Sequence, residues 1–545
     1  MLLSPRSKRW LLFLLLIAGG LFGLHLAKDR LAAKALRSVA QVAERSGHRI
    51  TFGSVSVSLS GGHIRIGDLD VVPMADSTVE DSAVRYTLHA DAIDLQGVDL
   101  VALLRSKVLH VGHIELHAPS VVHSFITRAT PSVAPTKAPR DSTKAALAGL
   151  AVLKVDTLLI VDATGRSQDR ASTSAALAVA DLDLLFTGLN VQVDEQGAPQ
   201  PTLLQARIEL HKAEAHVKPY YTLTLDSVRV RMPENTAAVF GMHFTPDVAP
   251  KEYHKYVKHQ VELYQASADT LLLTGFDVAA KLRDGALRAH SLYIAGVAVN
   301  IHRDKTLPLA PVRSKALMAD RVTSWKLPIA LDSVVVHRAS VTYHERLKPG
   351  ADYGSIAFTH ITGQLTGFSN EPSPEPPDLH LVGTARVGRA SARLDLRMPM
   401  QRERSTVTAH VLLTGFPANG MNRMTDDLLH VEATAGMLHR VEMNMHGDEH
   451  RATGTVDMRY EDLHLRIGPQ IKHAKVFSFV ANTVVRTANM PGSKGYRIGH
   501  FQVERPVDAG VFKYIWISLR EGMMDVVLPP ALLKQMKKGK RKGKK

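Results

Sequence analysis

The chain of 545 residues has no cysteine, and aromatic residues make up only 6% of it. Without cysteine it cannot contain a disulfide scaffold, a thiol nucleophile or a thiolate zinc site. It has a single long apolar run, which excludes a membrane protein with many spans. Because 45% of the residues are hydrophobic, disorder of the whole chain is excluded as well. The length fits three or four ordinary domains or one elongated, repetitive body.

Positive charge is concentrated at the carboxyl end of the chain. Lys and Arg number 67 against 52 Asp and Glu, and eight of the basic residues lie within 534–545, where there is no acid. The rest of the chain is therefore only mildly basic. A tail of this composition cannot bury apolar surface, so we predict that 531–545 is disordered and able to bind a polyanion such as acidic lipid headgroups or nucleic acid.

The amino terminus carries the one apolar run, 10–26, and basic residues precede it. Seventeen helical residues span about 25 Å, which is at the short end of what a bilayer needs. A cleavable signal peptide is the alternative, but the run continues directly into a helical pattern over 29–47 instead of a small-x-small site. We therefore predict a cytoplasmic stub and transmembrane anchor over 1–28, with the remainder outside the cytoplasm.

After Gly47 the hydrophobic pattern has period two, and this continues to the end of the chain. Alternation on both sides of Gly61-Gly62 predicts a β-hairpin, and many similar runs follow. Helical patterns are few: one covers 251–265, and a second, 511–528, is an amphipathic helix or a cap on the last strand edge. The Pro-rich stretches 129–146 and 369–378 are predicted linkers.

The sequence contains an internal duplication with a shift of 178 residues. The stretch from Tyr86 aligns without a gap to the stretch from Tyr264, and Thr-Gly-Phe or Thr-Gly-Leu recurs at 187, 274, 366 and 414. Such repeats are typical of a body that stacks similar units along an axis. We predict a first β-repeat unit over 48–235, a second over 236–415 and a C-terminal β unit with a terminal amphipathic helix over 416–530.

Alternating strands offer one apolar face, which must be covered by something. Either two sheets pack as sandwiches, or one curved sheet leaves an apolar concave face for another occupant. Strand alternation places one set of apolar side chains on this face in both repeats. These residues are Ile93, Leu95, Ile114 and Leu116 in the first repeat and Leu271, Leu273, Leu292 and Ile294 in the second.

The sequence has no pattern typical of a catalytic or metal site. His113 and His117 share a strand face but have no third ligand nearby, and the pairs Asp68/Asp70 and Asp181/Asp183 are common on polar strand faces. No nucleotide-binding loop and no nucleophile elbow is present. We predict no catalytic residue, no metal site and no cofactor.

Several stretches of the chain match, in order, the motifs of one known protein family. After the anchor the chain reads AERSGHRITFGSVSVSLSGGHIRIGDLDV and then HADAIDLQGVDLVALLRSKVLHVGHIELHAPSVV. Further matches are IHRDKTLP from Ile301, SVTYHERLKPGADYGSIAFTHITGQLTGFSN from Ser340, ATGTVDMRYEDLHLRI from Ala452 and VFKYIWISLREGMMDVVLP from Val511. In this order they resemble AsmA-like envelope proteins of Bacteroidota, and they cover nearly the whole chain after the anchor.

The resemblance implies a relation to TamB-like and chorein-like bridge proteins, in which a taco-shaped β-sheet with an apolar groove carries phospholipids between membranes. It implies an inner-membrane protein with a single span, a cytoplasmic N-terminus and a periplasmic body. Its partners would be a phospholipid or other envelope lipid, the inner membrane and an outer-membrane or periplasmic protein, and not nucleic acid. At 545 residues the chain would be a short member.

We therefore expect a mainly β, non-enzymatic protein: a single N-terminal transmembrane helix, then an elongated, repetitive taco-like sheet with an apolar groove and a few short helices. It would take part in lipid transport and outer-membrane homeostasis. The eight apolar residues above are the candidate lipid contacts. Candidates for membrane docking are Phe512, Trp516, Lys537, Lys538 and Arg541. The alternatives are an envelope scaffold or outer-membrane assembly factor made of β-sandwich repeats and, third, a cryptic hydrolase or glycan-binding protein.

Overall fold

The protein is mainly β, and its described residues divide into two compact units. The computed structural model describes residues 48–58, 62–73, 84–99, 106, 108–125, 152–169, 175–193, 199–217, 219–283, 285–311, 315–400, 405–422, 431–467, 486–493 and 495–528. Unit 1 comprises the chain up to Phe244 together with Gly275–Asp284, and unit 2 comprises Thr245–Thr274 and the chain from Gly285. The repeat boundaries predicted above stay predictions.

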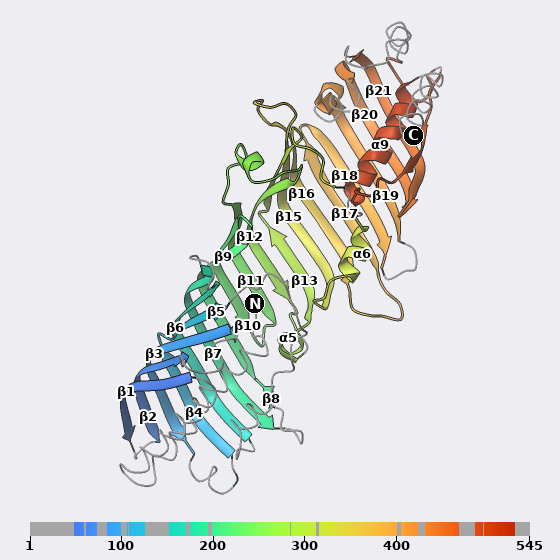
Figure 1. The fold of residues 1–545 in the computed structure, drawn as a ribbon. Helices are drawn as coiled ribbons and strands as arrows, with labels where there is room; N and C mark the ends of the chain where they lie inside the picture. The colour runs from blue at the N-terminus through green and yellow to red at the C-terminus, as the bar shows by residue number, and fades with distance from the viewer. Residues whose placement is uncertain are drawn as a thin grey trace. The chain divides into compact units, whose positions relative to one another are not determined.

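Unit 1 is a mixed sheet whose strands are β1 His48–Ser58, β2 His63–Pro73, β3 Val84–Val98, β4 Val108–His117, β5 Ser120–Phe125, β6 Val152–Asp169, β7 Ala175–Val193, β8 Pro199–Thr202, β9 Gln205–Val217 and β10 Tyr221–Arg231 (Figure 1). The short helix α5, Val278–Arg283, belongs to this unit, and β11, Thr236–Pro246, contains the boundary. The predicted hairpin is confirmed, because β1 pairs antiparallel with β2.

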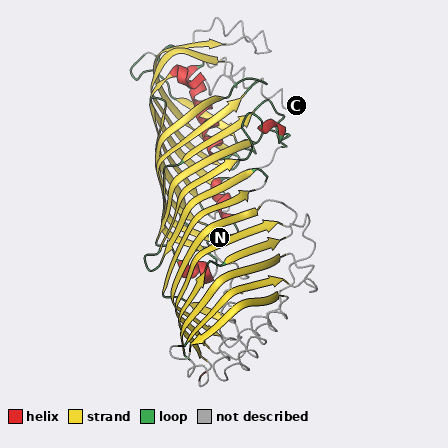
Figure 2. Cartoon of the chain, turned by 90° about the vertical axis from the view of Figure 1, so that its left-hand side faces the viewer, coloured by secondary structure: helices red, strands yellow, loops and turns green. Residues whose placement is uncertain are grey.

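Unit 2 is also a mixed sheet. Its strands are β12 Glu262–Thr274, β13 Leu287–Ala295, β14 Ala298–Asp304, β15 Ile329–Arg346, β16 Gly354–Ser369, β17 Asp378–Val387, β18 Ala390–Pro399, β19 Thr406–Pro417, β20 Val431–Asp448, β21 Arg451–Ile467 and β22 Gly499–Glu504. Its helices are η3 Tyr253–Lys255, α6 Met318–Thr323, η4 Ala418–Met421 and α9 Val511–Val527. The ladder is continuous from β12 to β22, and its strands bend along their length (Figure 2).

The internal duplication corresponds to a repeated topology. In unit 1, β3 pairs antiparallel with both β4 and β5, and these two run parallel to β6. In unit 2, β12 pairs in the same way with β13 and β14, which run parallel to β15. The break between the paired short strands lies at Ala118 and at its repeat equivalent Gly296, and both adopt positive φ. The shift of 178 residues thus relates two copies of one broken-strand module.

The recurring Thr-Gly motif marks positions where the backbone must adopt a left-handed conformation. Its four glycines all have positive φ: Gly188 63°, Gly275 64°, Gly367 72° and Gly415 68°. Glycine adopts this conformation without the steric cost that a Cβ atom brings. The motif therefore reflects one backbone requirement that all four positions share.

Some predictions of local structure are wrong or lie outside the described residues. The stretch 251–265 is not a helix: it contains only the single turn η3 and the beginning of β12. Its aromatic spacing fitted a helix, but the last four residues, from Glu262, pair with β14 as part of the sheet. The predicted linker at 369–378 is confirmed between β16 and β17, while 129–146 lies outside the described residues.

The predicted anchor 1–28 and helix 29–47 also lie outside the described residues. Among the residues that are described, no helix has both the length and the apolar composition needed to span a bilayer.

Candidate functional site

One face of the unit 2 sheet presents apolar side chains that are only half-buried. We call this set the apolar strip; it comprises Leu271, Leu273, Leu292, Ile294, Val334, Val336, Leu365 and Leu381. Strand register places these residues in rows across the sheet, since Leu273 pairs with Leu292 and Leu292 with Val334. The rows continue through Leu365 to Leu381. Side chains in cross-strand register lie on the same face, so the strip is one continuous surface.

The eight predicted lipid contacts therefore fall into two groups. The four of the second repeat belong to the apolar strip and are half-buried. Those of the first repeat occupy the corresponding registers in unit 1, where Leu95 pairs with Ile114. They are 1–4% exposed and belong to a buried cluster whose described members are all strand residues. Only the second group offers apolar surface to a ligand in this structure.

The same face of unit 2 is covered from β18 onward. Rows of the strip continue into Leu396, Met443, Met445 and Val456, which are at most 3% exposed. Helix α9 covers them, with its buried side chains Tyr514, Ile515, Leu519 and Met523 in the same cluster (Figure 1). Helix α6 contributes Ala319 and Val322 to this cluster, together with its N-cap residue Leu317, and contacts β16 and β18. Leu365 and Leu381 also pack against this cluster, so the covered part of the face overlaps the β16–β17 end of the strip.

Helix α9 confirms the predicted helix at 511–528 but corrects its placement. It packs across β20, β21 and β22 and does not cap only the last strand edge. Of the two predicted docking residues in the helix, Phe512 is 56% exposed, whereas Trp516 packs against the buried cluster. Lys537, Lys538 and Arg541 lie outside the described residues. The helix is therefore amphipathic, with its apolar face already occupied by the sheet.

A polar network lies at the ends of β12, β14 and β15. Its buried centre is the ion pair between Arg346 and Asp304, and the Arg346 guanidinium lies 5.4 Å from the Tyr353 ring centroid. Burial alone would raise the pKa of Asp304, but hydrogen bonds from Arg346 and Thr306 outweigh it and hold the pKa below its usual value. The two charges neutralise each other, although the Arg346 Nε atom is buried without a hydrogen-bond partner.

Two histidines stack beside this network. The His302 and His344 rings are parallel, with centroids 4.3 Å apart. Burial and, as the smaller cause, the neighbouring His344 together lower the pKa of His302 to about 4. Both imidazoles are thus neutral near pH 7, and the pair acts as aromatic packing.

The carboxylate pairs and histidines that the sequence singled out behave as polar-face residues. Carboxylate oxygens of Asp162, Asp181 and Asp183 lie within 4.8 Å of one another, and Asp183 also accepts a hydrogen bond from the Asp162 amide. His113 and His117 both contact Glu115, at 3.4 and 3.6 Å. Neither group forms an enclosed site.

The chain matches no established protein-family profile, and no curated protein is similar enough in sequence to be a relative. Function is therefore inferred from the geometry of the apolar strip and from the resemblance of the sequence motifs.

Proposed function

We propose that this chain is a membrane-anchored, non-enzymatic envelope protein that binds lipid on the apolar strip of unit 2. The bent sheet would act as a taco-like groove, with the strip as its floor. Acyl chains would lie along the strip, and the protein would take part in lipid transport and outer-membrane homeostasis in the periplasm. The AsmA-like resemblance supports the cellular setting, and the strip supports the ligand class.

The observation that carries the proposal is the contrast between covered and uncovered parts of one face. Where α9 packs on the sheet, apolar residues such as Met443 are fully buried; on the strip, residues in continuous register with them keep exposed surface. Each square ångström of apolar surface removed from water contributes about 25 cal/mol, so an acyl chain on the strip gains free energy without any polar contact. Lipid is favoured over a polar ligand because the strip consists of aliphatic side chains.

Site-specific photo-crosslinking in cells tests this proposal. A photo-reactive amino acid at Leu292 or Ile294 should capture lipid, identified by mass spectrometry of the purified adduct. At Tyr293, which alternation places on the opposite face, it should capture none. Met443 is the matched control for an apolar position already covered by α9.

The result also separates the alternatives. If the photo-reactive residue at position 292 is crosslinked to another protein instead of a lipid, the result would support a scaffold that binds another protein. Equal lipid labelling at Leu292 and Tyr293 would contradict a ligand confined to the strip, and absence of lipid from both would refute lipid binding.

A further inference from the structure

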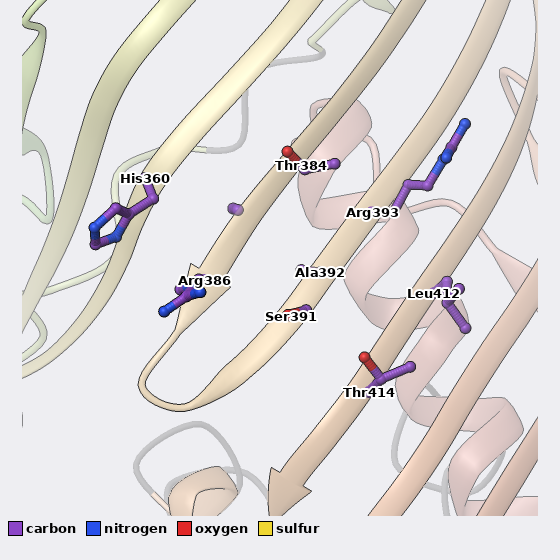
Figure 3. A pocket seen from close by; sticks show the side chains of 9 residues that line it. His360, Thr384, Arg386, Ser391, Ala392, Arg393, Leu412 and Thr414 are labelled. Atoms are coloured by element: carbon purple, nitrogen blue, oxygen red, sulfur yellow. The ribbon is translucent and has the colours of Figure 1, made fainter.

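The polar face of unit 2 contains a depression of about 270 Å³ that the proposed lipid site does not use. Its polar lining residues come from β16 to β19 and are His360, Thr384, Arg386, Ser391, Arg393 and Thr414 (Figure 3). Alternation places Arg386 and Arg393 opposite Val387 and Leu394, which pack toward the apolar cluster. None of the lining residues is an acid.

Basic side chains elsewhere in unit 2 commonly have acidic partners. His380 lies 2.9 Å from Asp395, His410 lies 2.9 Å from Glu442, Arg440 lies 2.6 Å from Glu442 and Arg459 lies 2.7 Å from Asp457. By contrast, no carboxylate in the described part of the chain is within ion-pair distance of Arg386 or Arg393. The depression is therefore a local excess of positive charge whose counter-ion is not an acid of the described sheet.

Strand register brings the two guanidinium groups within reach of one anion. Thr384 pairs with Arg393 and Arg386 pairs with Ser391, so the two arginines are diagonal neighbours on adjacent strands. Diagonal positions are about 7–8 Å apart at the backbone, a gap that two long side chains easily close. Ser391 also pairs with Thr414, which adds hydroxyl donors beside the guanidinium groups.

The two arginines extend in different directions in Figure 3. Both residues are exposed, and exposed side chains change rotamer in picoseconds to nanoseconds. An anion between them would lower the energy of the rotamers that converge on it, because guanidinium groups donate paired hydrogen bonds to phosphate oxygens.

We propose that this depression binds a phosphate group, either free as a phosphate monoester or carried by a lipid headgroup. Two guanidinium groups and several hydroxyls offer more hydrogen-bond donors than a planar carboxylate can accept. A phosphate group has enough oxygen atoms, pointing in several directions, to accept them. The site is independent of the apolar strip, because it lies on the other face of the sheet.

Titration calorimetry on the full chain in a neutral detergent tests the site, with inorganic phosphate and soluble dibutyryl phosphatidic acid as separate probes. The variant Arg386→Gln/Arg393→Gln should weaken binding of both probes about tenfold or more. Arg440→Gln removes a guanidinium on the same sheet that is already paired with Glu442, and it should leave binding within about twofold of wild type. The basic tail contributes equally to all three proteins, so their difference isolates the depression.

A second variant introduces the missing negative charge. Thr384→Glu should abolish the saturable heat of phosphate binding. It should leave the melting temperature unchanged, because residue 384 is exposed. Tighter binding of phosphatidic acid than of phosphate assigns the site to lipid headgroups, and equal affinity assigns it to free phosphate esters. Wild-type binding by the double arginine variant, or the absence of a saturable site in the wild type, would overturn the proposal.

Discussion

Gly522 of α9 lies directly against Val456 of β21. A Cβ atom at Gly522 would come within 2.2 Å of Val456 Cγ2, and one at Gly499 of β22 would come within 2.2 Å of the Gly522 carbonyl oxygen. Because both residues lack a side chain, the helix backbone can rest on the strands. This close approach completes the core at the carboxyl end of the sheet.

Gly522→Val should therefore push α9 away from the sheet. We expect a loss of about 1–3 kcal/mol in the free energy of unfolding, as for overpacking of a buried contact, and increased binding of a hydrophobic dye. Urea denaturation measures the first effect and fluorescence the second. Gly354→Val is the control, because a Cβ there meets only the Glu345 carbonyl oxygen at 3.8 Å. If the two variants are equally stable, the close contact between α9 and the sheet at Gly522 is contradicted.

His302 should make the protein less stable in mild acid. Its folded-state pKa is about 4 and its ordinary value is 6.5, so between these values the unfolded chain binds a proton that the folded chain does not. Stability therefore falls as the pH is lowered through this window, by up to about 3 kcal/mol.

The variant His302→Gln should flatten this part of the stability–pH profile, as measured by urea denaturation from pH 7 to 4. His290→Gln removes an exposed histidine paired with Asp332 and should leave the slope as in the wild type. An unchanged slope in His302→Gln would show that other groups set the acid sensitivity.

Removing Arg346 should strongly destabilise unit 2. Asp304 would remain buried without its counter-charge, a change that costs about 3–5 kcal/mol at neutral pH. Because the folded-state pKa of Asp304 is lowered, its contribution is present above the ordinary value of 3.8 and is lost as the pH falls through the folded pKa.

The destabilisation by Arg346→Met should accordingly shrink in strong acid. Arg397→Met is the control: its pair with Asp395 is 3.7 Å long and its side chain is 56% exposed, so the loss should stay below about 1 kcal/mol. Denaturation at pH 7 and pH 3 measures both variants. Equal losses in the two would argue against a buried ion pair at Asp304.

Phe512 and Trp516 should respond differently to a charge. Phe512→Asp adds a carboxylate at an exposed position and should change stability by less than about 0.5 kcal/mol, whereas Trp516→Asp should cost about 3 kcal/mol because its indole packs on the core.

If α9 also docks on a membrane, Phe512→Asp reduces co-sedimentation with anionic vesicles at unchanged melting temperature. Deletion of Lys534 to Lys545 should remove the salt-sensitive part of that binding. If neither Phe512→Asp nor the deletion of Lys534 to Lys545 changes vesicle binding, docking on a membrane is refuted.

Local patterns in the sequence were sufficient for much of the fold. Alternation predicts the β1–β2 hairpin, the apolar spacing of 511–528 predicts α9, and the Pro-rich stretch 369–378 predicts a loop; the structure confirms each. The shift of 178 residues indicates a repeated module, and β3–β6 and β12–β15 share one topology. These features depend on short-range backbone geometry and on which face of an element is apolar, and both can be inferred from neighbouring residues.

What covers each apolar face was decided only by tertiary structure. Leu95 and Leu273 have the same place in the repeat, yet Leu95 is 1% exposed while Leu273 keeps exposed surface. The parallel pairing of β13 with β15 and the position of α9 on the sheet likewise join segments far apart in the chain. Burial depends on which distant segments pack on a strand, and residue spacing carries no information about that. The sequence by itself thus determined the strands, the repeat and the apolar parity, whereas tertiary packing determined where the apolar face stays open.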